Sequence, residues 1–405
     1  MTRDLALRRL LGGRRVAVLC LNFGPYHIAR LRAIAQALAP FDARLVGLEL
    51  AAVETQYPWR VAREREPFEW RTLVADRPVE AVTPSEQRRR TRQALDALDP
   101  AAVVIPGWSH AFLRAAAAWA RRRGAVSVVA SDSAAGTRRS GATVVQRKWL
   151  LELYKRWLLR GFDAGVAAGN ASRDYLIGLG MPPERVLLKY DVVDNAFFAR
   201  LADETRAGAD RYRAQLTVPR RFFLYPSRMQ ERKNHLGLLD AYARYLKRAG
   251  GDAWALVLVG SGETQRAVDR RVAEIGSPLI VRRDFAQAED LARYYGLASA
   301  LVFPSWAETW GLIVNEAAAA GLPVLVSNAC PVVEHLVVEG ENGWSFDPLN
   351  ANQLADLLAR VAALPEEELA RLGAASRRIV SEWGVDDHAA NVLAAIALGA
   401  ENRKG

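Results

Sequence analysis

Continuous apolar runs alternate along the chain with segments in which apolar residues recur at helical spacing. Residues 16–21 (VAVLCL) form one such run, which is typical of a parallel strand buried on both faces. A turn over 22–26 and a helix over 27–38 follow it. This order indicates a parallel sheet covered by helices on both faces. The next predicted elements are strands over 102–105, 126–130 and 165–168, and a helix over 111–123.

A second series of strands and helices begins after residues 190–198. Its predicted strands cover 221–225, 255–259, 279–281, 300–303 and 324–327, and its predicted helices cover 235–248, 264–275, 288–297 and 311–320. Two such series predict an α/β fold of two doubly wound domains facing each other across a cleft. Residues 54–93 lack this periodicity, and we interpret them as an irregular insertion plus one helix.

Composition and charge narrow the classes of protein that fit this pattern. The 405 residues carry 55 Lys and Arg against 45 Asp and Glu, a formal charge of +10, which excludes an acidic disordered protein and favours an anionic partner. The two cysteines, Cys20 and Cys330, lie too far apart in sequence for a disulfide framework and suit a reducing cytoplasm. We expect a protein without a signal peptide or a membrane span, because no apolar run approaches about 18 residues.

The segment 300–323 (ALVFPSWAETWGLIVNEAAAAGLP) combines a buried strand, a loop and a helix. Ligands of α/β sheets bind at the carboxyl ends of strands, and the unpaired N–H groups of a helix start suit a phosphate. Glu308 lies in this loop and Glu316 lies in the helix, so one carboxylate could bind hydroxyls at the mouth and the other a deeper part of the ligand. Alternatively, they are a helix-start glutamate and an ordinary surface glutamate.

Two other predicted strand ends also carry residues that suit a phosphate-containing ligand. Residues 223–236 place Arg228 and Lys233 before a helix that Asn234 could cap, and two such cations can neutralise a diphosphate. Gly260 and Gly262 follow the strand 255–259, where the backbone must approach something closely. Together these strand ends predict a site for an anion and hydroxyl groups.

These motifs together resemble a known family. Arg228–x4–Lys233, LVLVGSGE, Glu308–x7–Glu316, GLPVLVS and ENGWSFDP are similar to the C-terminal domain of retaining glycosyltransferases of family 4. The resemblance is dense over 221–349, and it implies the GT-B fold of two facing Rossmann-like domains. It implies an N-terminal acceptor-binding domain over 1–193, onto which a C-terminal helix within 384–405 returns, and a donor-binding domain over 194–383.

The resemblance also implies roles for the donor side. Arg228 and Lys233 would hold the diphosphate of a nucleotide-sugar such as a UDP- or GDP-sugar. Glu308 would contact hydroxyls of the donor sugar and act in catalysis, and Glu316 would contact the ribose. The remaining residues expected to bind the donor are Gly260, Gly262, Thr309, Trp310 and Gly311.

The acceptor side departs from the family pattern. A single Gly24 stands in the first loop where a glycine pair is frequent, and the chain places Asp132 where many members carry a catalytic histidine. Asp132 could accept a hydrogen bond from the acceptor or the donor sugar, and His27 or His110 could supply the missing imidazole. Taken singly, each histidine fits a structural role better than a catalytic one. The residues expected on the acceptor side are Gly24, Pro25, Tyr26, His27 and Trp108.

No Asp-x-Asp motif occurs, so we expect no metal on the diphosphate and no cofactor. Arg228, Lys233 and the start of the helix 311–320 would stabilise the departing nucleotide diphosphate instead. No residue presents itself as a covalent nucleophile. We therefore expect attack on the same face as departure, with the leaving phosphate helping to deprotonate the acceptor hydroxyl, as the resemblance implies.

Residues 147–160 (RKWLLELYKRWLLR) form a basic amphipathic helix that could lie on an anionic membrane. The alternative is that its apolar side packs on the N-terminal sheet and leaves a solvated polar face. Arg88, Arg89, Arg90 and Arg92 form a second basic cluster. If either cluster binds lipid, the acceptor is a lipid or a lipid-linked saccharide. The predicted location is the cytoplasm, at the inner face of the membrane in that case.

Three other functions fit parts of the sequence. Nucleic-acid binding would explain the charge, but no recognition helix, RNA-binding strand motif or zinc module accompanies it. Residues 107–111 (GWSHA) come close to the nucleophile elbow of serine hydrolases, with Ser109 as nucleophile, although Ala111 replaces the last glycine. A nucleotide-sugar epimerase or a phosphorylase would keep the fold and change the reaction.

Overall fold

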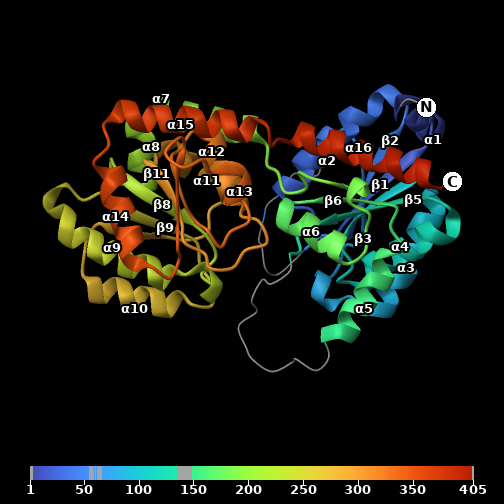
Figure 1. Ribbon diagram of the computed structural model, residues 1–405, viewed down its shortest axis with the longest axis horizontal. Coiled ribbons are helices and arrows are strands. Elements are labelled where there is room, and N and C mark those ends of the chain that lie inside the picture. The colour runs from blue at the N-terminus through green and yellow to red at the C-terminus, as the bar shows by residue number, and fades with distance from the viewer. Residues whose placement is uncertain (1–2, 54–58, 60, 62–65, 135–147, 404–405) are drawn as a thin grey trace. The chain divides into compact units, whose positions relative to one another are not determined.

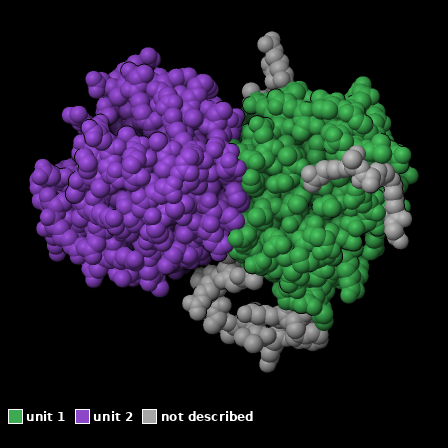
Figure 2. Space-filling view, turned by 45° about the horizontal axis from the view of Figure 1, so that its top comes forward, with its two compact units in different colours: residues 1–193, 384–405 green, residues 194–383 purple. Residues whose placement is uncertain are grey.

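The structure is a computed structural model that describes residues 3–53, 59, 61, 66–134 and 148–403, with the side chains of 3 and 148–150 excepted (Figure 1). The chain divides into two compact units, shown in Figure 2. Unit 1 comprises residues 1–193 and 384–405, and unit 2 comprises residues 194–383. The assignment of the acceptor to the first unit and the donor to the second stays a prediction.

Unit 1 is built on a parallel sheet. Its described strands lie in the order β3-β2-β1-β4-β5-β6-β7, which reverses direction between β1 and β4 as in a doubly wound fold. The runs of Val, Ala and Leu that form the central strands are buried on both faces, as at β5, where all six residues are buried. The strands are β1 (Arg15–Cys20), β2 (Arg44–Ala51), β3 (Glu69–Val74), β4 (Ala102–Pro106), β5 (Val126–Ser131), β6 (Ala164–Ala167) and β7 (Val186–Leu187).

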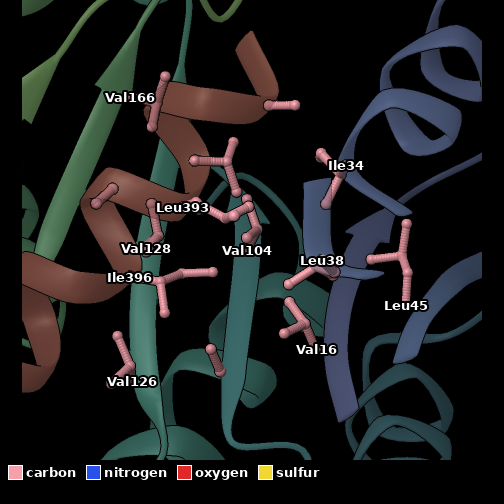
Figure 3. Packing of buried hydrophobic residues seen from close by; sticks show 14 of the residues in the cluster. Val16, Ile34, Leu38, Leu45, Val104, Val126, Val128, Val166, Leu393 and Ile396 are labelled. Atoms are coloured by element: carbon pink, nitrogen blue, oxygen red, sulfur yellow. The ribbon is translucent and has the colours of Figure 1, made fainter. Parts of the chain in front are cut away.

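Helices cover both faces of this sheet. Helices α1 (Arg3–Leu11), α2 (Pro25–Leu38) and α16 (Val385–Asn402) contribute to one apolar core, and α3 (Pro84–Leu98), α4 (Ala111–Arg123) and α6 (Asn170–Gly178) to the other. Figure 3 shows Leu393 and Ile396 of α16 lying over Val104, Val126 and Val128 of the sheet. The last helix of the chain is therefore part of the first unit's core.

Unit 2 repeats the architecture with described strands in the order β10-β9-β8-β11-β12-β13, all parallel. The order reverses between β8 and β11, so the loops that follow these two strands are neighbours. The strands are β8 (Phe222–Pro226), β9 (Ala255–Val259), β10 (Ile280–Arg283), β11 (Ala300–Phe303), β12 (Val324–Ser327) and β13 (Gly343–Phe346). The helices are α7 (Asn195–Ala207), α8 (Ala209–Leu216), α9 (His235–Ala249), α10 (Gln265–Ile275), α11 (Ala288–Leu297), α12 (Leu312–Ala319), α13 (Val333–Leu336), α14 (Ala351–Ala362) and α15 (Glu366–Ser381).

The sequence pattern did not predict the strands β2, β3, β7 and β13. The interpretation of 54–93 as an irregular insertion with one helix is wrong in part, because β3 lies within it and α3 extends to Leu98. As a strand at the edge of the sheet, β3 carries polar residues that are only partly buried, which hides its period. In β2 the apolar run is interrupted by Gly47 and by the fully buried Glu49. The short edge strands β7 and β13 were not predicted either.

For helix α5 (Lys148–Leu159), the alternative in which the apolar side packs on the sheet is wrong, because large apolar side chains of that side are exposed. Leu153, Tyr154 and Trp157 are exposed by 53%, 46% and 56%. Lys155 is turned toward the protein, where its Nζ donates to the Tyr175 hydroxyl at 2.8 Å. None of the helices in the described part of the chain is both long and apolar enough to cross a bilayer.

The packing of α16 makes a prediction for the stability of unit 1. Ile396 is fully buried, so Ile396→Ala should lower the free energy of unfolding of this unit by about 2–5 kcal/mol. Val53→Ala, at a residue that is 56% exposed, should change it by less than about 0.5 kcal/mol. Urea denaturation, with hydrogen exchange separating the two units, measures both. Equal effects of the two variants would contradict the role of α16 in the core.

Candidate functional site

The centre of the candidate site in unit 2 is the carboxylate of Glu308, which is 7% exposed. Lys233 Nζ donates to its Oε1 at 2.5 Å, and Arg232 Nη1 donates to its Oε2 at 2.7 Å. Arg232 Nη1 also donates to the carbonyl of Ala307 at 3.1 Å. Each oxygen of a buried acid thus has its own cation, which offsets the cost of removing the charge from water.

Arg232 was not predicted as a site residue, although it directly precedes Lys233 in the sequence. The loop after β8 places both cations, and the loop after β11 places Glu308. The two loops are in contact, because the N–H of Trp306 donates to the carbonyl of Arg232 at 3.0 Å. The Tyr225 hydroxyl of β8 donates to the carbonyl of Lys233 at 2.7 Å and lies 3.3 Å from Ser305 Oγ in the loop after β11. Arg228 lies at the start of the same loop, directly after Ser227.

Asn234 occupies the residue before α9, as predicted, but its side chain does not cap the helix. Its Nδ2 donates instead to the carbonyls of Pro304, at 3.0 Å, and Pro348, at 2.9 Å. The backbone there is left-handed, with φ of 55°, which asparagine tolerates better than most residues. The prediction of a side-chain cap is wrong, because this side chain ties the loop after β8 to the loop after β11.

The two glycines after β9 let backbone approach backbone. Gly260 and Gly262 have φ of +130° and +157°, and a Cβ on them would lie 2.3 Å from the carbonyl oxygen of Ser227 and 2.5 Å from that of Met229. The close approach predicted at these positions is therefore made, in this structure, to the loop that carries Arg228. A contact with a ligand stays a prediction.

The start of α12 holds the other predicted donor-side residues. Thr309 is half-buried, and the helix begins at Leu312, directly after Gly311. The Trp310 ring is 1% exposed, donates through Nε1 to Asn315 Oδ1 at 2.9 Å and stacks on Trp383 at 5.3 Å. The buried ring therefore supports the loop after β11 from the inside of the unit.

Glu316 lies deeper in α12 and is 1% exposed. The Tyr295 hydroxyl donates to its Oε2 at 2.7 Å. The alternative of an ordinary surface glutamate is wrong for Glu316, because the residue is buried in the helix that starts at the site.

On unit 1, the predicted acceptor-side residues Gly24, Pro25, Tyr26 and His27 form the first turn of α2 and its cap. The N–H of Gly24 donates to His27 Nδ1 at 3.1 Å, so the imidazole completes the cap of its own helix. Burial, and secondly the charge of Arg30, lower the pKa of His27 to about 3. His27 is therefore neutral near pH 7 and a weak base.

A buried polar cluster that the sequence did not reveal lies beside His27. Arg30 Nη2 donates to Asp191 Oδ1 at 3.2 Å, and Arg30 Nε donates to the carbonyl of Val192 at 3.1 Å. The guanidinium lies 5.0 Å from the centre of the Tyr190 ring. A cavity of about 30 Å³, room for one water molecule, is lined by His27, Arg30, Tyr190 and His388 among others.

Asp132 belongs to the surroundings of this cluster. Burial raises the pKa of Asp191 to about 6, the charge of Arg30 opposes the rise, and the charge of Asp132 adds to it. Asp132 itself is half-buried at the carboxyl end of β5. The structure therefore brings Asp132 electrostatically close to Asp191. The cluster could not be predicted from any short stretch of sequence, because its residues come from α2, the 190–193 segment and α16.

His110 and Trp108 lie in the loop between β4 and α4. His110 Nδ1 and the exposed Ser109 hydroxyl are 2.8 Å apart, and burial, followed by the charge of Arg114, lowers the pKa of His110. Within the described residues, no carboxylate hydrogen-bonds to His110, so the third member of a hydrolase triad is not in place there. Nor do the described parts of the chain hold three or more His, Cys, Asp or Glu grouped around a metal position.

Comparisons with known proteins find similar glycosyltransferases. Residues 209–379 match the family model described as glycosyl transferases group 1. The chain is 30% identical over 56% of its length to a D-inositol 3-phosphate glycosyltransferase of Thermomonospora curvata. It spans about half (54%) of that relative and smaller shares of two other glycosyltransferases.

Solved structures share the fold along almost the entire chain. A glycosyltransferase of Rickettsia africae superposes with a TM-score of 0.71 at 15% identity, covering 95% of this chain and 97% of its own. The Anabaena protein HepE, in complex with UDP and glucose, superposes with a TM-score of 0.69 at 16% identity, covering 94% and 99%. The predicted fold class is confirmed: two Rossmann-like α/β domains, as in GT-B structures.

The pairing of Glu308 predicts unequal coupling to its two cations. The Lys233 side chain is 16% exposed and that of Arg232 is 43% exposed. We expect a coupling free energy of about 1–3 kcal/mol for Lys233 with Glu308 and less than about 1 kcal/mol for Arg232 with Glu308. Double-mutant cycles in urea, with Lys233→Gln, Arg232→Gln and Glu308→Gln, measure both couplings. Stronger coupling of Glu308 to Arg232 than to Lys233 would contradict the expectation.

The lowered pKa values of His27 and His388 predict how the stability of unit 1 depends on pH. Burial, with Arg30 as the second cause, lowers the pKa of His27 and His388 to about 3, whereas an unfolded histidine titrates near ~6.5. Between these values the unfolded chain binds more protons, so stability should fall as the pH drops from about 6.5 toward 3. Asp191, with its raised pKa of about 6, should offset part of this loss.

Urea unfolding of unit 1 at a series of pH values tests this expectation. The variant His388→Gln removes one titrating group and should flatten the slope below pH 6.5, while His110→Gln, at a half-buried residue, should flatten it less. An unchanged slope in His388→Gln would show that this histidine is not held neutral by its surroundings.

Proposed function

We propose that the protein is a glycosyltransferase that moves a sugar from a nucleotide-sugar, a UDP- or GDP-sugar, to a hydroxyl group of an acceptor. The observation that carries the proposal is the meeting of Arg232, Lys233 and Glu308 at the carboxyl ends of β8 and β11. It lies within the residues that match glycosyl transferases group 1. The name of the relative from Thermomonospora curvata supports sugar transfer, and the Anabaena complex with UDP supports a nucleotide-linked donor.

In this proposal, binding of the donor moves Lys233 from Glu308 to the diphosphate. The diphosphate takes Lys233, together with Arg228, and so releases Oε1 of Glu308 toward the hydroxyls of the donor sugar. Arg232 keeps Oε2 paired, so no buried charge is left without a partner at any stage. The cations then stabilise the charge that develops on the leaving diphosphate, and Glu308 positions the sugar.

The finer features are proposals as well. The transfer is of the retaining, family 4 type, with attack on the face from which the nucleotide diphosphate leaves, and it requires no metal ion or cofactor. Gly260, Gly262, Thr309 and Gly311 shape the donor site through their backbone. Glu316, which is buried in α12, accepts hydrogen bonds from the ribose.

Unit 1 is proposed to bind the acceptor, which belongs to the saccharides of the cell surface or to lipid-linked saccharides. Asp132 is the better candidate for a catalytic contact with a hydroxyl, because His27 is held neutral with its Nδ1 occupied by the N–H of Gly24. His110 and Trp108 contribute to the same surface of the unit. The expected location is the cytoplasm.

Three other reactions, those of a nucleotide-sugar epimerase, a phosphorylase and a hydrolase using Ser109, are less well supported. The relatives that match are glycosyltransferases by name. Product analysis with a labelled nucleotide-sugar separates the reactions that keep the fold: transfer joins the label to the acceptor, epimerisation returns it in the nucleotide-sugar, and a phosphorylase gives a sugar phosphate.

Binding of nucleoside diphosphates tests the donor site directly. Titration calorimetry with UDP, GDP and ADP should give one nucleotide that binds, and Lys233→Gln should weaken it by about 10–100-fold, since a hydrogen bond to a charged group is lost. Lys247→Gln, at an exposed lysine of α9, is the matched control and should change it less than about twofold.

Catalysis has a separate readout. Glu308→Gln should keep nucleotide binding within a few-fold of the unmodified protein but lower kcat by at least about 100-fold, because its charge acts on the reacting sugar. The proposal fails if no nucleotide or nucleotide-sugar binds and Glu308→Gln retains full activity.

A further inference from the structure

Helix α5 exposes a group of large apolar side chains on unit 1. Leu151, Leu153, Tyr154 and Trp157 are exposed by 52%, 53%, 46% and 56%. These are four of the ten large apolar side chains that the described residues expose by more than a third. We call these four residues the α5 patch. Apolar residues that are exposed singly are normal on a protein surface, whereas a group of them on one helix marks an interaction surface.

The rest of the helix explains why the α5 patch faces outward. Lys155 Nζ donates to the hydroxyl of Tyr175 in α6 at 2.8 Å, and Arg156 Nη2 donates to the carbonyl of Gly178 at 3.1 Å. Leu159 is 3% exposed and anchors the same side in the core. The helix is thus attached by its polar side and one leucine, at the periphery of the unit in Figure 1. The Tyr154 and Trp157 rings stack on each other, with centroids 6.1 Å apart.

Positive charge borders the α5 patch. Arg156 and Arg160 are exposed and, at 100° per residue, lie on the helix side next to Leu153. The acid within this stretch, Glu152, is paired with Lys155 at 2.8 Å, so it does not neutralise the two arginines. The surface is therefore apolar and aromatic with a basic edge.

We propose that the α5 patch docks on an anionic lipid bilayer, with the helix lying in the plane of the interface. Trp and Tyr prefer the boundary between head groups and acyl chains, leucines enter the acyl region, and arginines at the edge bind lipid phosphates. Contact with a second copy of this chain fits less well, because it would bring the basic edges of two copies together.

The surface acts independently of the donor site. Combined with the proposed function, on which this step rests, it places the acceptor among lipid-linked saccharides at the membrane surface. Loss of membrane binding and loss of nucleotide binding are measured on different units of the chain, so either can fail alone.

Flotation of the full chain with vesicles tests the proposal. Binding should be at least about tenfold stronger to vesicles of phosphatidylcholine with 40% phosphatidylglycerol than to phosphatidylcholine alone, and it should weaken with salt. Tyr154→Ser with Trp157→Ser should reduce it by at least about tenfold. Leu349→Ser, at a residue of unit 2 that is 79% exposed, is the apolar control and should have no effect.

The charge is tested by a matched pair of variants. Arg156→Gln with Arg160→Gln should reduce binding to anionic vesicles by at least about threefold, whereas Arg88→Gln with Arg89→Gln, an exposed pair on α3, should leave it unchanged. Unchanged urea unfolding of unit 1 in the serine and arginine variants confirms that they fold.

Three outcomes would overturn the proposal. They are equal binding by the serine variant and the unmodified protein, equal loss in both arginine pairs, and a dimer in sedimentation that the serine variant abolishes while no vesicle binds. The last outcome would assign the α5 patch to a second copy of the chain.

Discussion

A buried carboxylate that must be paired organises unit 2. The carboxyl group of Glu308 is 7% exposed, and Lys233 and Arg232 reach it from another loop. That contact requires β8 and β11 to be neighbours, which the reversal of strand order provides. It also requires the loop after β8 to be held in place, and the glycines after β9 and the side chain of Asn234 hold it. The chemistry proposed for the site uses the same pairing.

The same constraint shapes unit 1, with different residues. Glu49 is fully buried in β2 and accepts from the N–H of Phe23, the Trp70 indole and the Thr72 hydroxyl. Arg30 and Asp191 pair beneath the first turn of α2, where the low exposure holds His27 neutral. In both units, polar groups that would be costly to bury alone are made compatible with the core by partners from distant segments.

Much of the fold and part of the site followed from local patterns. Strands such as β1, β5 and β9 are continuous apolar runs because helices cover both faces of their sheets, and this burial leaves a signal in any short window. The edge strands β3 and β13 leave a weaker signal, since one side of each lacks a neighbouring strand. Lys233, Glu308 and Glu316 were singled out by their places after predicted strands and in the helix that follows, and by the motifs that resemble the family. Arg232 and the cluster around Arg30 were not, because their importance depends on contacts 76 and 161 residues away.

Local sequence specifies the alternation of strands and helices, the two doubly wound series and the loops that carry the candidate chemistry, because each depends on neighbours within a few residues. Folding alone determines which cation pairs with which oxygen of Glu308, where the side chain of Asn234 points and which side of α5 meets water. The energy of burying an apolar or charged group depends on what surrounds it, and those surroundings come from segments that the chain brings together only on folding.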